Sequence, residues 1–142
     1  MSRVCTLAMF VLLMGCGAKE RNSLPTENAA CSRSGIFVSR QGHFVVRPST
    51  QRWVPGEDNK IVYRILTGEL KPPSPEFSFQ FNHRMPTMPH MIIPKTKPVV
   101  LGPGHIEVVY EIAHGGFWEF EIRLYQNNTL VDTLVYTVTI PD

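Results

Sequence analysis

Strict alternation of apolar and polar residues is the feature that most constrains how this chain folds. The stretch from Trp118 to Leu124 alternates aromatic or aliphatic residues with charged ones, and the stretch from His105 to Ala113 alternates in the same way. Phe77, Phe79 and Phe81 repeat the pattern. A period of two is typical of β-strands that have one face in a core and one face in solvent. Beyond the N-terminal segment no stretch keeps a helical period, so the chain is predicted to be all-β.

Further strand-like stretches and the turns between them predict the architecture. Residues 60–66 and 130–140 are rich in β-branched and aromatic residues, and residues 36–39 and 43–47 are suited to a hairpin. Clusters of Gly, Pro and Asn separate these stretches at short intervals. About seven short strands at this spacing predict an immunoglobulin-like β-sandwich that occupies residues 36–142.

The N-terminal segment, residues 1–15, is predicted to be a signal peptide. Arg3 precedes an apolar run from Val4 to Leu13, which is shorter than the roughly 20 residues that cross a bilayer but suits a secretory signal. Leu13-Met14-Gly15-Cys16 resembles the lipobox of bacterial lipoproteins, apart from Met14, where that family usually has a small or β-branched residue. The resemblance implies that Cys16 is lipidated. The alternative is an ordinary secretory signal with a cysteine nearby.

Residues 16–35 are predicted to form a flexible tether between the lipid and the domain. Their composition is polar and small, so they cannot bury enough apolar surface to offset their ordering entropy. Gly17 follows the cysteine in place of aspartate, so the inner-membrane retention signal of many lipoproteins is absent. We therefore expect an outer-membrane anchor with the domain facing the periplasm. Cys31 lies in the tether and has no predicted disulfide partner.

Methionine is confined to one short segment of the predicted mature chain. Of the six methionines, three lie in the signal and the others lie between Met85 and Met91. Methionines that merely filled a core would be scattered among the strands. Neighbouring prolines predict a stiff, extended segment, or a tight turn at either proline that would bring three of the candidate ligands together. Thioether and imidazole groups suit Cu(I). The candidate copper ligands are Met85, Met88 and His90, with Met91 and His83 as further candidates. The alternative is that these methionines simply cap the open end of the sandwich.

These motifs resemble the YtkA-like domain proteins and their FixH-type relatives. The shared pattern is Met85-Pro86-Thr87-Met88-Pro89-His90, followed by Ile112-Ala113-His114-Gly115-Gly116-Phe117-Trp118. The resemblance covers roughly Val54 to Leu124 and implies a β-sandwich outside the cytoplasm, with some relatives near copper handling and haem–copper oxidase assembly. Many relatives carry methionine where this chain has His114, and imidazole keeps a donor atom there. His114 is therefore expected to close the metal site across the sheet.

Other polar and aromatic residues have simpler interpretations. His43 and His105 are interpreted as solvated turn residues, and Glu119 and Glu121 as the wet face of one strand. Trp53 and Trp118 are interpreted first as packing anchors.

The sequence thus predicts a lipid-anchored protein outside the cytoplasm that buffers or delivers Cu(I) by ligand exchange. Its expected partners are membrane lipid through Cys16 and a membrane copper protein or a haem–copper oxidase assembly factor. The alternative is a metal-free module that docks a membrane complex through the segment from Met85 to Met91. No nucleophile–base pair or phosphate-binding loop stands out, so an enzyme is not predicted. No basic patch favours nucleic acid.

Overall fold

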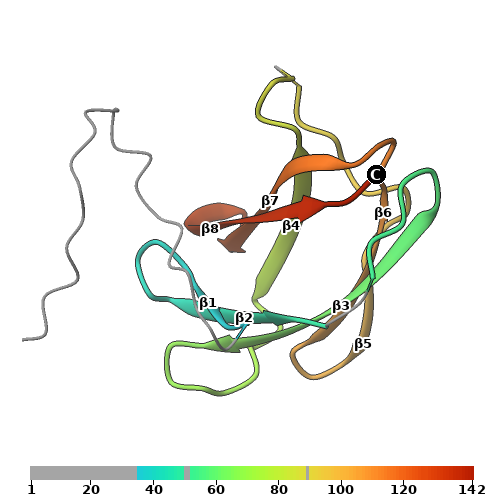
Figure 1. Ribbon diagram of the computed structural model, residues 1–142. Coiled ribbons are helices and arrows are strands. Elements are labelled where there is room, and N and C mark those ends of the chain that lie inside the picture. The colour runs from blue at the N-terminus through green and yellow to red at the C-terminus, as the bar shows by residue number, and fades with distance from the viewer. Residues whose placement is uncertain (1–34, 50–51, 89) are drawn as a thin grey trace, which may run out of the picture.

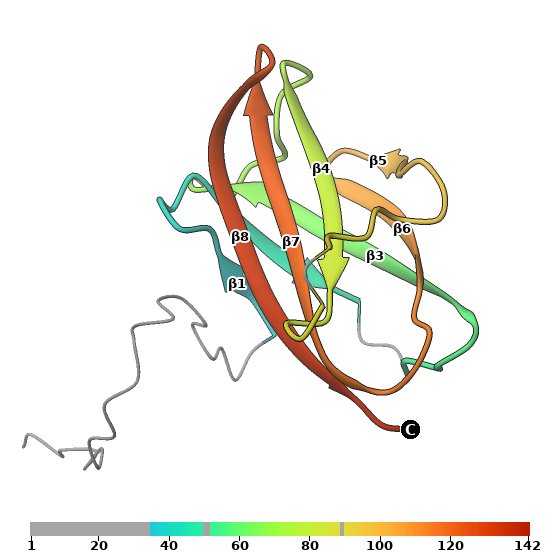
Figure 2. The same cartoon turned by 90° about the horizontal axis from the view of Figure 1, so that it is seen from above.

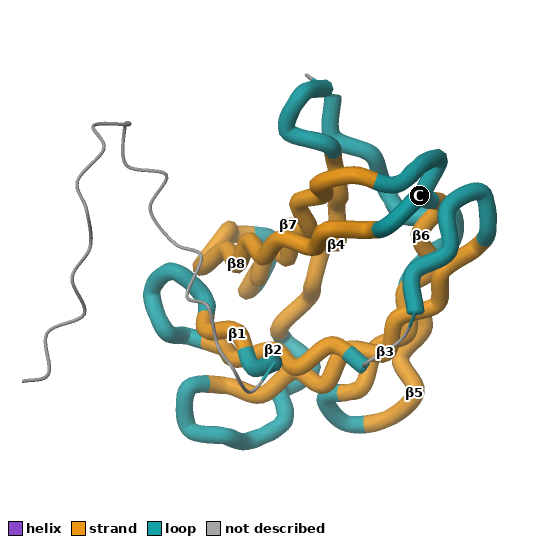
Figure 3. The backbone as a smooth tube through the Cα atoms, in the orientation of Figure 1, coloured by secondary structure: helices purple, strands orange, loops and turns teal. Residues whose placement is uncertain are grey.

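The computed structural model describes residues 35–49, 52–88 and 90–142. In these ranges the chain is built of strands and loops without helix, as Figure 3 shows, so it has no helix able to cross a bilayer there. The strands are β1 (Phe37–Val38), β2 (Phe44–Pro48), β3 (Asp58–Thr67), β4 (Phe77–Arg84), β5 (Val99–Gly102), β6 (His105–Glu111), β7 (Gly116–Gln126) and β8 (Thr129–Ile140). The predicted signal peptide, Cys16, Cys31 and the tether up to residue 34 lie outside the described residues.

The strands form two antiparallel sheets that face each other. One sheet has the order β1-β2-β3-β6-β5, and the other has the order β4-β7-β8. Figures 1 and 2 show β4, β7 and β8 as one layer lying across the layer that contains β2, β3 and β6. The predicted immunoglobulin-like sandwich is therefore confirmed, including the hairpin of β1 and β2.

The described residues contain eight strands, in place of the seven or so expected, and the difference is β5. This strand pairs with β6, and its register shifts between Val100 and Gly102. It is short and lies between Pro98 and Pro103. Four residues with a shifted register show no alternation, and a bulge of this kind is common at sheet edges. The sequence pattern therefore gave no sign of this edge strand.

The predicted alternation determines which side chains form the core. Tyr110, Trp118 and Phe120 are fully buried between the sheets, and each such side chain contributes roughly 1.5–3 kcal/mol by its burial. Glu119 and Glu121 point to the outer face, as expected. Glu119 accepts a hydrogen bond from Arg84 there. Glu121 accepts hydrogen bonds from Arg123 and Asn82.

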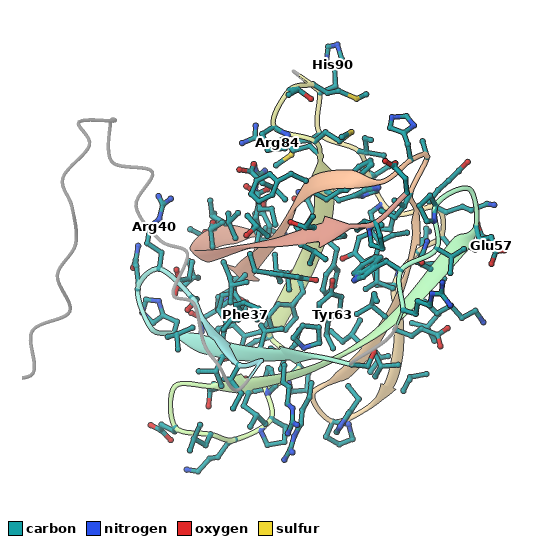
Figure 4. All side chains as sticks on the ribbon, viewed as in Figure 1. Phe37, Arg40, Glu57, Tyr63, Arg84 and His90 are labelled. Atoms are coloured by element: carbon teal, nitrogen blue, oxygen red, sulfur yellow. The ribbon has the colours of Figure 1, made fainter. Side chains whose placement is uncertain are left out.

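Three tyrosine hydroxyl groups meet in the middle of this core. The Tyr63 hydroxyl lies 2.8 Å from that of Tyr110 and 2.7 Å from that of Tyr136. Figure 4 shows Tyr63 between the two layers. Tyr63 and Tyr136 belong to different sheets, so this contact links the sheets by a hydrogen bond. Burial raises the pKa of all three phenols, which therefore stay neutral.

A buried carboxylate holds the turn between β1 and β2. Asp132 on β8 accepts hydrogen bonds from the Ser39 hydroxyl at 2.6 Å and from the backbone N–H groups of Gln41 and His43 at 3.0 and 3.1 Å. Burial raises the pKa of Asp132, but the hydrogen bonds from Ser39 and from backbone N–H groups outweigh burial and lower it. His43 is half exposed, as a turn residue should be, but its Nδ1 also lies 3.2 Å from Asp132. His43 is thus an exposed turn residue as predicted, and its contact with Asp132 adds a role that the sequence did not show.

We expect Asp132→Asn to lower the free energy of unfolding by about 2–3 kcal/mol at pH 7, because an amide has one acceptor oxygen where the carboxylate has two. The measurement is urea denaturation. The folded-state pKa of Asp132 is depressed, so its contribution is present above the unfolded pKa and is lost as the pH falls through the folded value. The difference between the two proteins should therefore shrink in acid.

Asp58→Asn is the matched control. Asp58 is half exposed and accepts a hydrogen bond from Lys95 at 2.8 Å on the surface, where solvent screens the two charges, so the loss of this interaction should change the free energy of unfolding far less. Equal losses for the two variants would contradict a special role for the buried carboxylate.

Candidate metal site

The segment from Met85 to Met91, called here the methionine loop, is closed by a short backbone bridge. The N–H of His83 donates to the carbonyl of Ile92 at 2.9 Å, and the N–H of Ile92 donates back at 2.7 Å. The loop opens with a turn in which the Met88 N–H donates to the Met85 carbonyl at 2.9 Å. Pro86 takes the second position of this turn, where its fixed φ is favourable. This is the tight turn at a proline that is predicted as the alternative to an extended segment.

Three of the candidate ligands in this loop lie on its surface. Met88 is 40% exposed and Met91 is 38% exposed. His90 is also exposed, and Figure 4 shows it at the tip of the loop, pointing away from the sandwich. Pro89, between Met88 and His90, lies outside the described residues. These side chains are accessible to a ligand from solvent.

Met85 differs from its neighbours because it turns inward. It is half buried and packs against the core. Its Cε would lie 2.9 Å from a Cβ added at Gly116, whose φ of +124° is one that glycine tolerates. Met85 therefore occupies the space that a side chain at position 116 would need. This contact joins the methionine motif to the second motif of the sequence.

His114 lies two residues before Gly116, and its side chain is exposed. Its backbone carbonyl accepts a hydrogen bond from the Trp118 indole at 3.1 Å, which fixes the loop between β6 and β7. Ligation by the His114 imidazole stays a prediction.

His83 is the most unusual polar side chain in this end of the sandwich. It lies on the inner face of β4, directly opposite Phe120 of β7, and is fully buried. Its ring lies 5.0 Å from that of Tyr110, 5.7 Å from that of Trp118 and 6.0 Å from that of Phe120. Aromatic neighbours on several sides thus fix the plane of the imidazole.

The hydrogen bonds of His83 determine its tautomer. Nε2 lies 3.2 Å from the backbone carbonyl of Glu111 on the other sheet, and a carbonyl can only accept, so Nε2 carries the proton. In the neutral ring Nδ1 is then a bare acceptor, and it is buried without a hydrogen-bond partner among the described residues. Burial lowers the pKa of His83, although the carbonyls of Glu111 and Ile92 oppose that shift. The ring is therefore neutral at pH 7.

This arrangement is the one that a metal-binding histidine adopts. Such residues almost always donate one ring N–H to a carbonyl or carboxylate and present the other nitrogen to the metal. Met85 lies two residues beyond His83, just after β4 ends, and it also packs against the core. In the described part of the chain no three His, Cys, Asp or Glu side chains are grouped to hold a metal. A site at His83 would need methionine sulfur as well.

From the sequence, His83 is predicted only as a further candidate ligand. The alternation of side chains along β4 would have given this residue more weight. Phe77, Phe79 and Phe81 define the inner face of β4, and the same period of two continues to His83. A histidine on a predicted core face needs a partner, whereas Met88 and His90 belong to a loop and have no such constraint.

Comparison with known proteins adds little to this picture. No family model matches the chain, and neither does any curated protein. The filamin domain of Lin-41 is 8% identical, with a TM-score of 0.41, over 66% of this chain and 91% of that domain. A Bacillus anthracis protein provisionally assigned as a lipoprotein is 12% identical, with a TM-score of 0.40, over 66% of this chain and 71% of its own. The similarity to YtkA-like proteins stays a resemblance of motifs.

We expect His83 to make the stability of the domain sensitive to mild acid. Its folded-state pKa is lowered, so its contribution to stability is fully present above the unfolded value of about 6.5 and is lost as the pH falls below that value. His83→Phe keeps a ring in the same space and cannot titrate. Urea denaturation between pH 7 and pH 5 should show a steeper loss of stability for the unmodified protein than for this variant. Parallel pH profiles would contradict the burial of a neutral imidazole.

Gly116→Ala should lower the free energy of unfolding by about 1–3 kcal/mol, since the new methyl group meets Met85 and the φ is unfavourable for alanine. Thermal or urea unfolding measures the loss. Adding Met85→Ala should recover part of it. Gly102→Ala is the control, because a Cβ there meets nothing within 4 Å. Additive effects of Gly116→Ala and Met85→Ala would show that the two residues do not touch.

Proposed function

We propose that this protein binds Cu(I) at the end of the sandwich that carries the methionine loop. The observation that carries the proposal is the bare, buried Nδ1 of His83, whose Nε2–H is held by the Glu111 carbonyl. A buried acceptor without a partner is costly, and a bound water or ion is the usual explanation for one. A neutral imidazole beside a thioether selects a soft, singly charged metal over Mg²⁺ or Ca²⁺.

The proposed ligands fall into an inner pair and an outer group. The inner pair is His83 and Met85, which share the inner side of β4 and its extension. The outer group consists of the exposed Met88, His90, Met91 and His114. Weak outer thioethers can accept copper from solution or a donor protein and pass it inward, and the same exchange in reverse releases it. Aromatic rings around His83, including Trp118, would limit the access of water to the inner pair.

The location of the protein is part of this proposal. Residues 1–15 suit an export signal, and lipidation of Cys16 would anchor the domain to a membrane outside the cytoplasm. Gly17 favours the outer membrane, with the domain facing the periplasm. The tether of residues 16–35 would let the domain reach a membrane copper protein or an oxidase assembly partner. Buffering and delivery need no bond to be made or broken other than those to the metal.

A second candidate function rests on a separate observation. More than half of the large apolar side chains that are exposed in the described residues come from one stretch of the chain: Met88, Met91, Ile93, Val99, Val100 and Leu101. An apolar concentration of this kind marks many protein-interaction surfaces. The alternative is therefore a metal-free module that docks a membrane complex through the methionine loop and β5.

The deciding experiment is an anaerobic titration of the protein with Cu(I) in competition with a chromophoric chelator. We expect one copper ion to bind per chain, and we expect the pair His83→Phe with Met85→Leu to weaken binding at least tenfold, on the order of 1.4 kcal/mol or more. The pair Met88→Leu with His114→Phe tests the outer group. His105→Phe is the control, because His105 is exposed and its Nδ1 lies 3.1 Å from the carbonyl of Pro103 in its own turn.

Failure of the unmodified protein to compete for copper would exclude the metal site. Copper binding that survives loss of the inner pair but not of the outer group would move the site to the loop surface. If the protein instead docks a partner through this loop, Met→Leu substitutions should leave partner binding largely intact, because leucine preserves an apolar contact. The same substitutions should weaken copper binding, because they remove the sulfur.

A further inference from the structure

The strand β4 lies at one edge of its sheet, and the chain itself covers this edge at both ends but not in the middle. Its neighbour in the sheet is β7, and Figure 2 shows β4 as the outermost strand of its layer, on the side of β5 and β6. At one end the Phe77 N–H donates to the Ser74 carbonyl at 3.1 Å. At the other end His83 and Ile92 exchange two backbone hydrogen bonds, of 2.9 and 2.7 Å. The open stretch of the edge lies between these two contacts.

The hydrogen bonds at the two ends show which backbone groups face the open stretch. Successive residues of an antiparallel strand direct their N–H and C=O groups alternately to one side and the other. Phe77 and His83 bond away from β7, so Phe79 and Phe81 also direct their backbone groups away from β7. Among the described residues, neither Phe79 nor Phe81 has a backbone partner on that side. Each therefore offers an N–H donor and a carbonyl acceptor to a further strand.

A groove with a volume of about 370 Å³ runs along this open stretch and is called here the β4 groove. One wall is β4 from Phe79 to Phe81, and the other is the segment of residues 93–98. This segment is fixed to the other sheet, because the Lys95 N–H donates to the Val109 carbonyl of β6 at 3.0 Å and the Lys95 Nζ donates to Asp58 at 2.8 Å. A strand that entered the groove would meet two walls already in place, which lowers the ordering cost of binding.

The side chains of the β4 groove define the kind of strand that fits it. The apolar part of the lining consists of Phe79, Phe81, Ile93, Pro94 and Pro98. Its charged residues are Lys95 and Lys97, which are exposed and both cationic. In the described part of the chain Lys97 forms no ion pair. Residues of an added strand directly opposite Phe79 and Phe81 would share their inward face, so apolar side chains suit those positions and a carboxylate suits the end near Lys97.

We propose that the β4 groove binds an extended, acidic segment of a partner protein, which adds to β4 as an antiparallel strand. Main-chain hydrogen bonds to Phe79 and Phe81 supply the attachment, and alternate apolar side chains and a carboxylate supply the specificity. The lining contains none of the proposed copper ligands, so peptide binding and copper binding can fail separately. It shares only Ile93 with the apolar surface of the methionine loop and β5.

The test is fluorescence anisotropy of the purified full-length protein with the labelled peptide Glu-Val-Ser-Val-Ser-Val-Glu. The valines would lie opposite Phe79 and Phe81, so their N–H groups would face β4. We expect one peptide to bind per chain, and we expect N-methylation of the valines to weaken binding at least about tenfold. N-methylation of the serines is the matched control, because those N–H groups would point away from β4. Equal effects of the two modifications, or no binding of the unmodified peptide at about 1 mM, would overturn the proposal.

Two pairs of protein variants test the walls of the groove. Ile93→Glu should weaken binding at least about tenfold, because it places a like charge in the apolar lining. Leu70→Glu is its control, since Leu70 is 67% exposed, close to the 71% of Ile93, and does not line the groove. Lys97→Glu should weaken binding about fivefold, whereas Lys60→Glu, at an exposed position outside the groove, should not change it. Equal affinities within either pair would contradict the proposed walls.

Amide hydrogen exchange measured by NMR locates the bound peptide. Peptide binding should slow the exchange of the Phe79 and Phe81 N–H groups, whereas the Gln80 N–H, which faces β7, should exchange slowly with or without peptide. Protection that appears elsewhere but not at Phe79 and Phe81 would overturn the proposal. A dimer of the protein in light scattering that Ile93→Glu abolishes would overturn it too, because the occupant of the groove would then be a second copy of this chain.

Discussion

The hydrogen bonds among the hydroxyl groups of Tyr63, Tyr110 and Tyr136 are the interaction around which this sandwich is organised. They place polar atoms in the centre of an apolar core and satisfy them there, and the bond between Tyr63 and Tyr136 joins the two sheets. The rings add stacked contacts, with Phe120 lying 5.2 Å from Tyr136 and Phe81 lying 5.2 Å from Tyr63. Close packing on these rings in turn limits where the side chains at either end of the core can go.

Each end of the core has a histidine whose ring is held by one oxygen atom. At the methionine loop, the His83 ring packs on Tyr110 and is bound to a backbone carbonyl, which leaves a buried Nδ1. At the opposite end, the His43 ring lies 3.2 Å from the Asp132 carboxylate and is half exposed. The first environment is closed to solvent and disfavours charge, whereas the second is open to solvent. The same residue type thus has two different surroundings because the oxygen partner and the burial differ.

Local alternation was a reliable guide to the strands and less so to the site. It predicted the long strands and the burial of residues such as Trp118, because side-chain direction within a strand follows from backbone geometry alone. It missed β5, which is too short to alternate, and it left open whether the methionine segment is extended or contains the turn in which Pro86 takes part. It also gave His83 too little weight, although His83 lies on the face that the phenylalanines of β4 define. The exposure of Met88 and His90 followed from neither alternation nor composition.

The sequence by itself determined the fold class, the inward and outward faces of the strands and the concentration of methionine in one loop beyond residues 1–15, because these follow from residue order and local backbone preference. The tertiary structure decided which donor atoms lack partners and which residues meet. Glu111 holds the imidazole of His83 from the other sheet, Gly116 gives space to Met85, and Asp132 reaches His43 from a strand 89 residues away in the sequence. Such pairs depend on the register and the packing of the two sheets, which no local pattern encodes.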